Sequence, residues 1–188
     1  PHDLRTFRFE DYINGTTSTQ GQGVIGLLDE LHAYYLGSKY CFDMYKAYVE
    51  AEGSDEAGLF TWVNRSQSSM SAFWEFDFFI CEYLLHMKNR YPSDYATLAD
   101  CQSFVKAYKA VRDAYKTLAE QYESLINSEI RNINESGKAR AWIEDGSLWI
   151  TPGGSNYSQG TPVFSDARGT LEPVLRSDRY KALAEILK

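Results

Sequence analysis

Hydrophobic residues over positions 23–53 recur at steps of three and four, which is the spacing that puts side chains on one face of an α-helix. This apolar stripe starts at Val24 and ends at Val49. Gly53 follows it, and glycine is favoured where a helix ends in the left-handed conformation. We therefore predict a first long helix over 23–53, after an irregular lead-in over residues 1–22.

A second helical segment follows at 54–90 and is much more hydrophobic. Ser54 can cap its N-terminus, and Pro92 disfavours helical geometry in the residue before it and so ends the helix. From Met70 to Met87 apolar side chains occupy nearly every face. A helix of this kind belongs in the centre of a fold.

The third predicted helix covers 93–136, with Ser93 as its cap and apolar residues close to a seven-residue repeat. The connections between the three helices are short, which favours antiparallel neighbours. The sequence therefore predicts an antiparallel bundle of three long helices over 23–136.

After Gly137 the pattern changes from helical to alternating. Two strands at 141–144 and 147–150 flank Asp145-Gly146, which favours a type I′ hairpin turn and sets Trp142 opposite Trp149. Glycines and prolines indicate a loop over 151–173, and Ser177 can cap a last short helix. We expect a soluble, mainly α single domain over 1–188, in which 137–188 supplies a hairpin, a loop and a short terminal helix.

The composition of the chain argues against some classes of function. The 188 residues carry a net charge of −7, which argues against non-specific binding to nucleic acid because that requires a basic surface. No apolar run reaches the length of a transmembrane helix. Cys41, Cys81 and Cys101 lack a metal-site or redox spacing, so we interpret them as small buried hydrophobic residues within helices.

The compartment is left open by the sequence. Four Asn-x-Ser/Thr sites, at Asn14, Asn64, Asn134 and Asn156, are compatible with export. The chain starts at Pro1, without an initiator methionine, so we expect that an upstream segment was removed. These two observations favour an exported or extracytoplasmic protein.

Carboxylates in apolar helices are the best candidates for chemistry, because an unpaired buried charge is unstable. Glu75, Asp77 and Glu82 lie in the hydrophobic second helix, and Glu30 lies on a second face of the first helix. Pairing of these groups with cations or tyrosines between helices is the main interpretation. His86 shares a face with Glu75 and Glu82, but we favour a salt-bridged face there over a metal site.

The segment Asp29-Glu30-Leu31-His32-Ala33-Tyr34 resembles the helix that supplies the third zinc ligand in gluzincin-type zinc peptidases. The resemblance implies that Glu30 is a zinc ligand and that Tyr34 and His32 lie at the binding site. The His-Glu-x-x-His motif of that family does not occur among this chain's histidines, His2, His32 and His86. Such an enzyme would therefore need an upstream segment.

Two functions follow. The first is a non-catalytic helical interaction or structural domain without a cofactor, which binds a protein or peptide; aromatic residues make up 15% of the chain and are favoured at contact surfaces. Homo-oligomerisation along the third helix is left open. The alternative is the C-terminal helical part of a zinc-dependent metallopeptidase.

Overall fold

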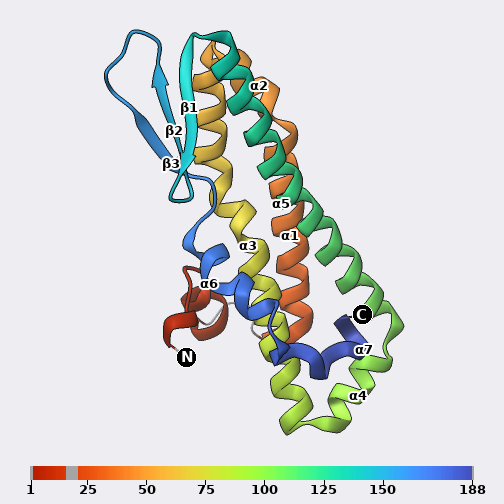
Figure 1. Ribbon diagram of the computed structural model, residues 1–188. Helices are drawn as coiled ribbons and strands as arrows, with labels where there is room; N and C mark the ends of the chain where they lie inside the picture. Colours follow the sequence, from red (N-terminus) through yellow and green to blue (C-terminus); the bar gives the residue numbers. More distant parts are fainter. Residues whose placement is uncertain (1, 16–20, 188) are drawn as a thin grey trace. The chain divides into compact units, whose positions relative to one another are not determined.

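The computed structural model describes residues 2–15 and 21–187 and confirms a mainly α fold with a small antiparallel sheet (Figure 1). The helices are α1 (Gly23–Asp43), α2 (Tyr45–Glu52), α3 (Asp55–Arg90), α4 (Pro92–Asp100), α5 (Gln102–Ser136), α6 (Asp166–Leu175) and α7 (Ala184–Leu187). The strands are β1 (Ala139–Glu144), β2 (Ser147–Pro152) and β3 (Gln159–Pro162). Within the described ranges, no helix is both long and apolar enough to cross a membrane.

The lead-in is more ordered than the sequence predicts. A 3-10 turn covers His2–Leu4 and a π-helical turn covers Glu10–Asn14. Residues 16–20 of the predicted lead-in lie outside the described residues. The expectation of an irregular segment is therefore wrong for part of residues 2–15.

Two of the three predicted long helices are interrupted. The first divides into α1 and α2 at Met44, whose ψ angle is 0°. The third divides into α4 and α5 at Cys101, whose ψ angle of 90° is extended. Ser93 is not a cap, because Pro92 already occupies the first turn of α4 and Tyr91 is the N-cap residue. The second predicted helix is continuous as α3, and Ser54 caps it by accepting a hydrogen bond from Ala57 N–H at 3.3 Å.

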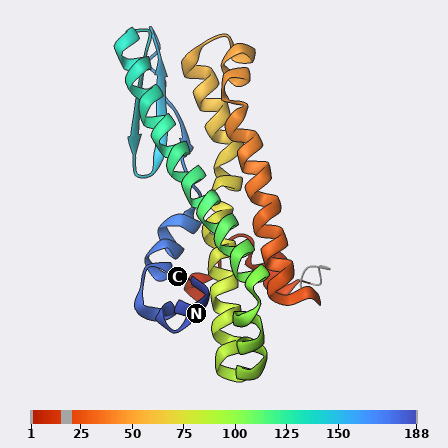
Figure 2. The same cartoon turned by 90° about the vertical axis from the view of Figure 1, so that its right-hand side faces the viewer.

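The chain forms two compact units, each built from separate stretches of sequence. Unit 1 contains Pro1–Tyr35, Ser71–Lys116 and Asp166–Lys188, and unit 2 contains Leu36–Met70 and Thr117–Ser165. Segments of α1, α3 and α5 run side by side in each unit (Figures 1 and 2). The organisation as a single domain stays a prediction.

The core of unit 1 is the apolar part of α3, as its all-round hydrophobicity predicts. Every residue from Ser71 to Ile80 is buried. Phe73 packs against Tyr115 of α5 with ring centroids 5.6 Å apart, and Phe76 packs against Tyr34 of α1 at 5.0 Å. The central position predicted for this helix segment is confirmed within its unit.

Trp62 of α3 is the centre of the core of unit 2 and is fully buried. Its indole N–H donates to the carbonyl of Cys41 at 2.7 Å, and its ring lies 4.9 Å from that of Tyr122. The close approach of α2 to α3 depends on Gly58, because a Cβ atom there would lie 2.5 Å from the Cα atom of Val49.

The sheet belongs to unit 2 and has the strand order β1-β2-β3. The predicted hairpin is confirmed: Asp145 and Gly146 both have positive φ angles, and Trp142 pairs with Trp149. The two indoles stack with centroids 6.4 Å apart. Trp149 also covers Gly160 of β3, where a Cβ atom would lie 2.8 Å from the indole ring.

The edge of β1 is occupied by a side chain. Asn134, at the end of α5, accepts a hydrogen bond from Ala141 N–H at 2.8 Å and donates its own amide N–H to the Ala141 carbonyl at 2.9 Å. The amide group therefore takes the place that a neighbouring strand would occupy at this residue.

The predicted loop over 151–173 is only partly a loop. It contains β3 and most of α6, which continues through Pro173 within the helix. The glycines and prolines of this stretch indicate a loop, so the sequence pattern did not reveal β3 or α6. Ser177 does cap the next helical turn, since its hydroxyl accepts a hydrogen bond from Arg179 N–H.

Candidate functional site

The N-terminal segment of unit 1 is anchored to α3 by a buried ion pair. The guanidinium of Arg8 contacts the Glu75 carboxylate, and Arg8 N–H donates to the same carboxylate at 2.9 Å. The Glu75 side chain is fully buried and that of Arg8 is 6% exposed. The carboxylate thus receives both a counter-charge and a backbone hydrogen bond, which offset the cost of burying it in an apolar core.

The side chains of Tyr34, Tyr12 and Glu30 extend the polar contacts of this ion pair. The Arg8 guanidinium lies over the ring of Tyr34, 4.8 Å from its centroid, and the hydroxyls of Tyr34 and Tyr12 are 3.4 Å apart. Burial raises the pKa of Tyr12, as do its hydrogen bonds to Tyr34 and to the carboxylate of Glu30. The phenol of Tyr12 therefore stays protonated and acts as a hydrogen-bond donor near neutral pH.

An apolar groove lies between the anchored segment and α3. Its volume is about 360 Å³, within the range of small-ligand sites. Leu4, Phe9 and Ile13 come from the N-terminal segment, and Phe78 and Phe79 come from α3.

Four polar side chains complete the lining: Arg5, Glu82, Tyr83 and His86. Arg5 lies over the ring of Phe9, 4.8 Å from its centroid. Tyr83 is 39% exposed, so the groove is open to solvent on this side.

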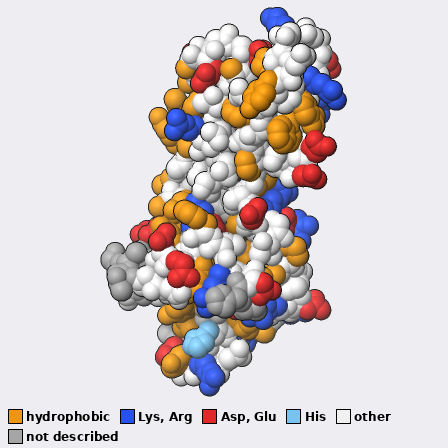
Figure 3. All heavy atoms as spheres, turned by 90° about the vertical axis from the view of Figure 1, so that its left-hand side faces the viewer, with side chains coloured by type: hydrophobic (Ala, Val, Ile, Leu, Met, Phe, Trp, Pro, Cys, Tyr) orange, Lys and Arg blue, Asp and Glu red, His pale blue; other side chains and the backbone are white. Residues whose placement is uncertain are grey.

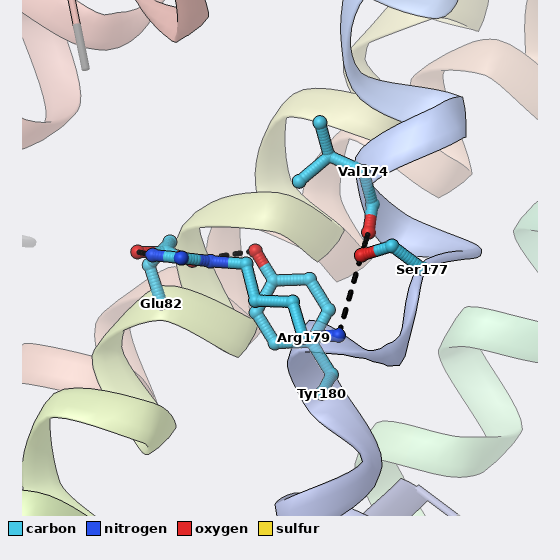
Figure 4. Close-up of polar contacts among 5 residues, drawn as sticks. All are labelled: Glu82, Val174, Ser177, Arg179 and Tyr180. Carbon is cyan, nitrogen blue, oxygen red and sulfur yellow. Dashed lines mark hydrogen bonds and ion pairs between the residues drawn. The ribbon is translucent and has the colours of Figure 1, made fainter.

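Glu82 is held by the C-terminal segment rather than by the groove (Figure 4). Arg179 donates to both carboxylate oxygens, at 2.5 and 2.7 Å, and Tyr180 donates its hydroxyl at 2.5 Å. Burial alone would raise the pKa of Glu82, but the bonds from Arg179 and Tyr180 and the charge of Arg179 lower it below its usual value. Glu82 is therefore a paired, ionised group.

A second contact holds the same C-terminal segment. Lys88 pairs with Glu185 at 2.5 Å and also contacts the carbonyl of Ala182, while Tyr95 of α4 donates to Glu185 at 3.0 Å. The hydrogen bond from Lys88 is the main reason that the pKa of Glu185 is lowered. Two ion pairs with α3 and a hydrogen bond from α4 thus hold residues 178–187.

Asp77 forms a separate buried cluster between α3 and α5. Its Oδ1 atom accepts hydrogen bonds from Tyr108 at 2.6 Å and from Arg112 at 2.8 Å. The Cys81 thiol lies 3.7 Å from the Tyr108 hydroxyl, and burial raises its pKa. A protonated thiol is a poor nucleophile, so we interpret this cluster as a structural contact between helices.

Of the residues predicted for a site, the structure brings Glu30 and Tyr34 together and separates His32 from them. Glu30 and Tyr34 both contact Tyr12, whereas His32 is exposed to solvent. Within the described part of the chain, no three His, Cys, Asp or Glu side chains are placed to hold a metal ion. The zinc-ligand role of Glu30 stays a prediction.

The face with Glu75, Glu82 and His86 is salt-bridged, as we favoured: Glu75 pairs with Arg8 and Glu82 with Arg179. Both arginines escaped the sequence analysis. Arg8 lies in the non-periodic lead-in and Arg179 in the short terminal helix, and no local pattern marks a cation whose partner is 67 or 97 residues away.

The cysteines follow the prediction in part. Cys81 is buried and Cys41 is half-buried, but Cys101 is exposed. Cys101 was expected inside a helix and instead lies at the break between α4 and α5. Hydrogen bonds from the Ser103 hydroxyl and the Phe104 amide lower the pKa of its thiol.

Comparisons with known proteins do not identify a relative. No family model, no curated protein and no solved structure matches this chain. Any function must therefore be argued from the residues of the groove and its surroundings.

Proposed function

We propose that this protein is a non-catalytic interaction domain that binds a segment of a partner protein or peptide in the groove of unit 1. The observation that carries the proposal is the apolar groove itself, which is lined by Phe9, Phe78 and Phe79 and stays open to solvent. Ile13 and Tyr83 on its lining are 40% and 39% exposed. Large apolar side chains left accessible in a concave site are typical of recognition surfaces.

The anchoring of the N-terminal segment supports this function. One wall of the groove comes from residues 4–13, and the buried pair of Arg8 and Glu75 holds that wall to α3. A wall fixed in this way is preorganised, which reduces the entropy lost on binding.

Other hydrophobic side chains reach the surface as separate patches among charged ones (Figure 3). Tyr157, at 73% exposure, is an example in unit 2. Single exposed apolar residues are normal on protein surfaces. The groove differs from them because it combines several aromatic rings with a concave shape.

A displayed library of random dodecapeptides, selected on the full chain, tests the proposal. We expect the selection to yield peptides that bind the Ile13→Glu variant at least tenfold more weakly than the wild type, because this change places a charge in the apolar groove. The control Ile143→Glu removes an apolar side chain of unit 2 that is also 40% exposed and should leave binding unchanged. Failure to select any peptide that distinguishes Ile13→Glu from the wild type would overturn the proposal.

A further inference from the structure

The polar groups around the groove are nearly all unused hydrogen-bond donors. Arg5 has a ring contact to Phe9, and His86 has a ring contact to Tyr91. Among the described residues, neither of these side chains nor the hydroxyl of Tyr83 has a hydrogen bond or an ion pair. The guanidinium and the imidazole can donate N–H groups, and the phenol can donate its O–H.

These donors come from both walls of the groove, and the Tyr83 hydroxyl lies beside Gly23 at the start of α1, where an added Cβ atom would be 2.5 Å from it. Tyr83 and His86 are three residues apart on α3 and so lie on one helix face. Arg5 comes from the opposite wall, in the N-terminal segment. A ligand seated between the two walls would meet donors from both sides.

The one acidic group of the lining cannot serve a ligand in the same way. Both oxygens of Glu82 accept hydrogen bonds from Arg179, and Tyr180 donates to one of them. Its charge is already offset by that arginine. A positively charged ligand would therefore meet the Arg5 guanidinium without a free carboxylate to balance it.

From this complementarity we propose that the groove selects an acidic peptide segment, in which a carboxylate stands beside a large apolar side chain. The apolar side chain packs on Phe9 and Ile13, and the carboxylate binds Arg5 with His86. This inference rests on the proposed function and adds the chemistry of the partner. A carboxylate matches the guanidinium in geometry and charge.

The peptides selected in the previous experiment provide the first test. Those that depend on Ile13 should be enriched in Asp or Glu within two residues of a Phe, Tyr, Trp, Leu or Ile. For one such peptide, synthetic versions with Glu, Gln and Lys at the acidic position are then compared by fluorescence anisotropy. We expect the Glu peptide to bind at least about fivefold more tightly than the Lys peptide, the ratio that one partly exposed charge pair gives.

Variants of the protein assign this preference to its source. On Arg5→Gln the ratio of the Glu and Lys peptides should fall towards one, while the Gln peptide still binds. Arg140→Gln is the matched control, because Arg140 is also an exposed guanidinium over an aromatic ring, 5.1 Å from Trp142, but lies in unit 2. It should leave the ratio unchanged.

The outcomes separate the two proposals. Groove-dependent peptides without acidic enrichment, or a Glu preference that persists on Arg5→Gln, would overturn the acidic partner and leave the peptide-binding function standing. Absence of any groove-dependent peptide would overturn both.

Discussion

The buried pair of Arg8 and Glu75 offers the sharpest test of how the groove is built. We predict that Arg8→Met strongly destabilises unit 1, because methionine fills part of the space but leaves the carboxylate unpaired. Glu75 would keep one backbone hydrogen bond and lose its counter-charge in a site with no solvent exposure. Removing one partner of a buried ion pair costs about 3–5 kcal/mol.

Urea unfolding followed by circular dichroism gives the free energy, and hydrogen exchange of amides 71–80 reports local opening around Glu75. The double variant Arg8→Met/Glu75→Gln removes the unpaired charge and should recover part of the loss. The exposed control Arg140→Met should stay within about 0.5 kcal/mol of the wild type. A deficit below about 1 kcal/mol for Arg8→Met, or no recovery in the double variant, would refute this account of the anchor.

Three further perturbations test other parts of the fold. Gly58→Ala should destabilise unit 2 by about 1–3 kcal/mol through overpacking. The control Gly37→Ala lies on an exposed helical position where an added Cβ atom meets no neighbour within 4 Å, and it should stabilise unit 2 by up to about 1 kcal/mol. Equal effects of the two changes in thermal unfolding would contradict the packing argument. Asn134→Ala should reduce stability by about 1–2 kcal/mol and speed hydrogen exchange of the Ala141 amide, which now donates to the Asn134 side chain. Unchanged exchange of that amide would contradict the role of Asn134 at the edge of β1. Because the pKa of Glu82 is lowered, the stability that its ion pair contributes is present above about pH 4.3 and is lost as pH falls through the lowered pKa. Amide hydrogen exchange within residues 178–187 should therefore become faster in acid, and Glu82→Gln should make it faster already at pH 7. Unchanged exchange in this segment on Glu82→Gln would show that the contact with Arg179 does not hold it.

The elements that were predicted correctly have strong local signals. Pro92 ends α3 because its ring restricts the preceding residue, and Asp145-Gly146 fixes the hairpin register because both residues adopt positive φ angles. The breaks at Met44 and Cys101 leave the three- and four-residue spacing of apolar positions intact. At Met44 the backbone hydrogen bonds also continue from α1 into α2. The break there is therefore small, and the sequence of apolar positions does not mark the end of α1.

The site was less accessible to sequence analysis. Glu75 could be recognised as a carboxylate that needs a partner, because its helix is apolar on all faces. Its partner Arg8 lies in a segment without periodicity, and only the tertiary fold brings the two together. The groove could not be predicted for the same reason, since its walls come from residues 4–13 and from 78–86.

The Asn134 side chain also limits how this protein can assemble with others. Strand addition needs a row of free backbone N–H and C=O groups along a sheet edge. On β1 the groups at Ala141 are already satisfied, and on β3 Pro162 has no N–H to offer. Each edge of the sheet is thus interrupted at one residue, which weakens the pairing that a strand from a second molecule could form there and disfavours fibre-like stacking through unit 2.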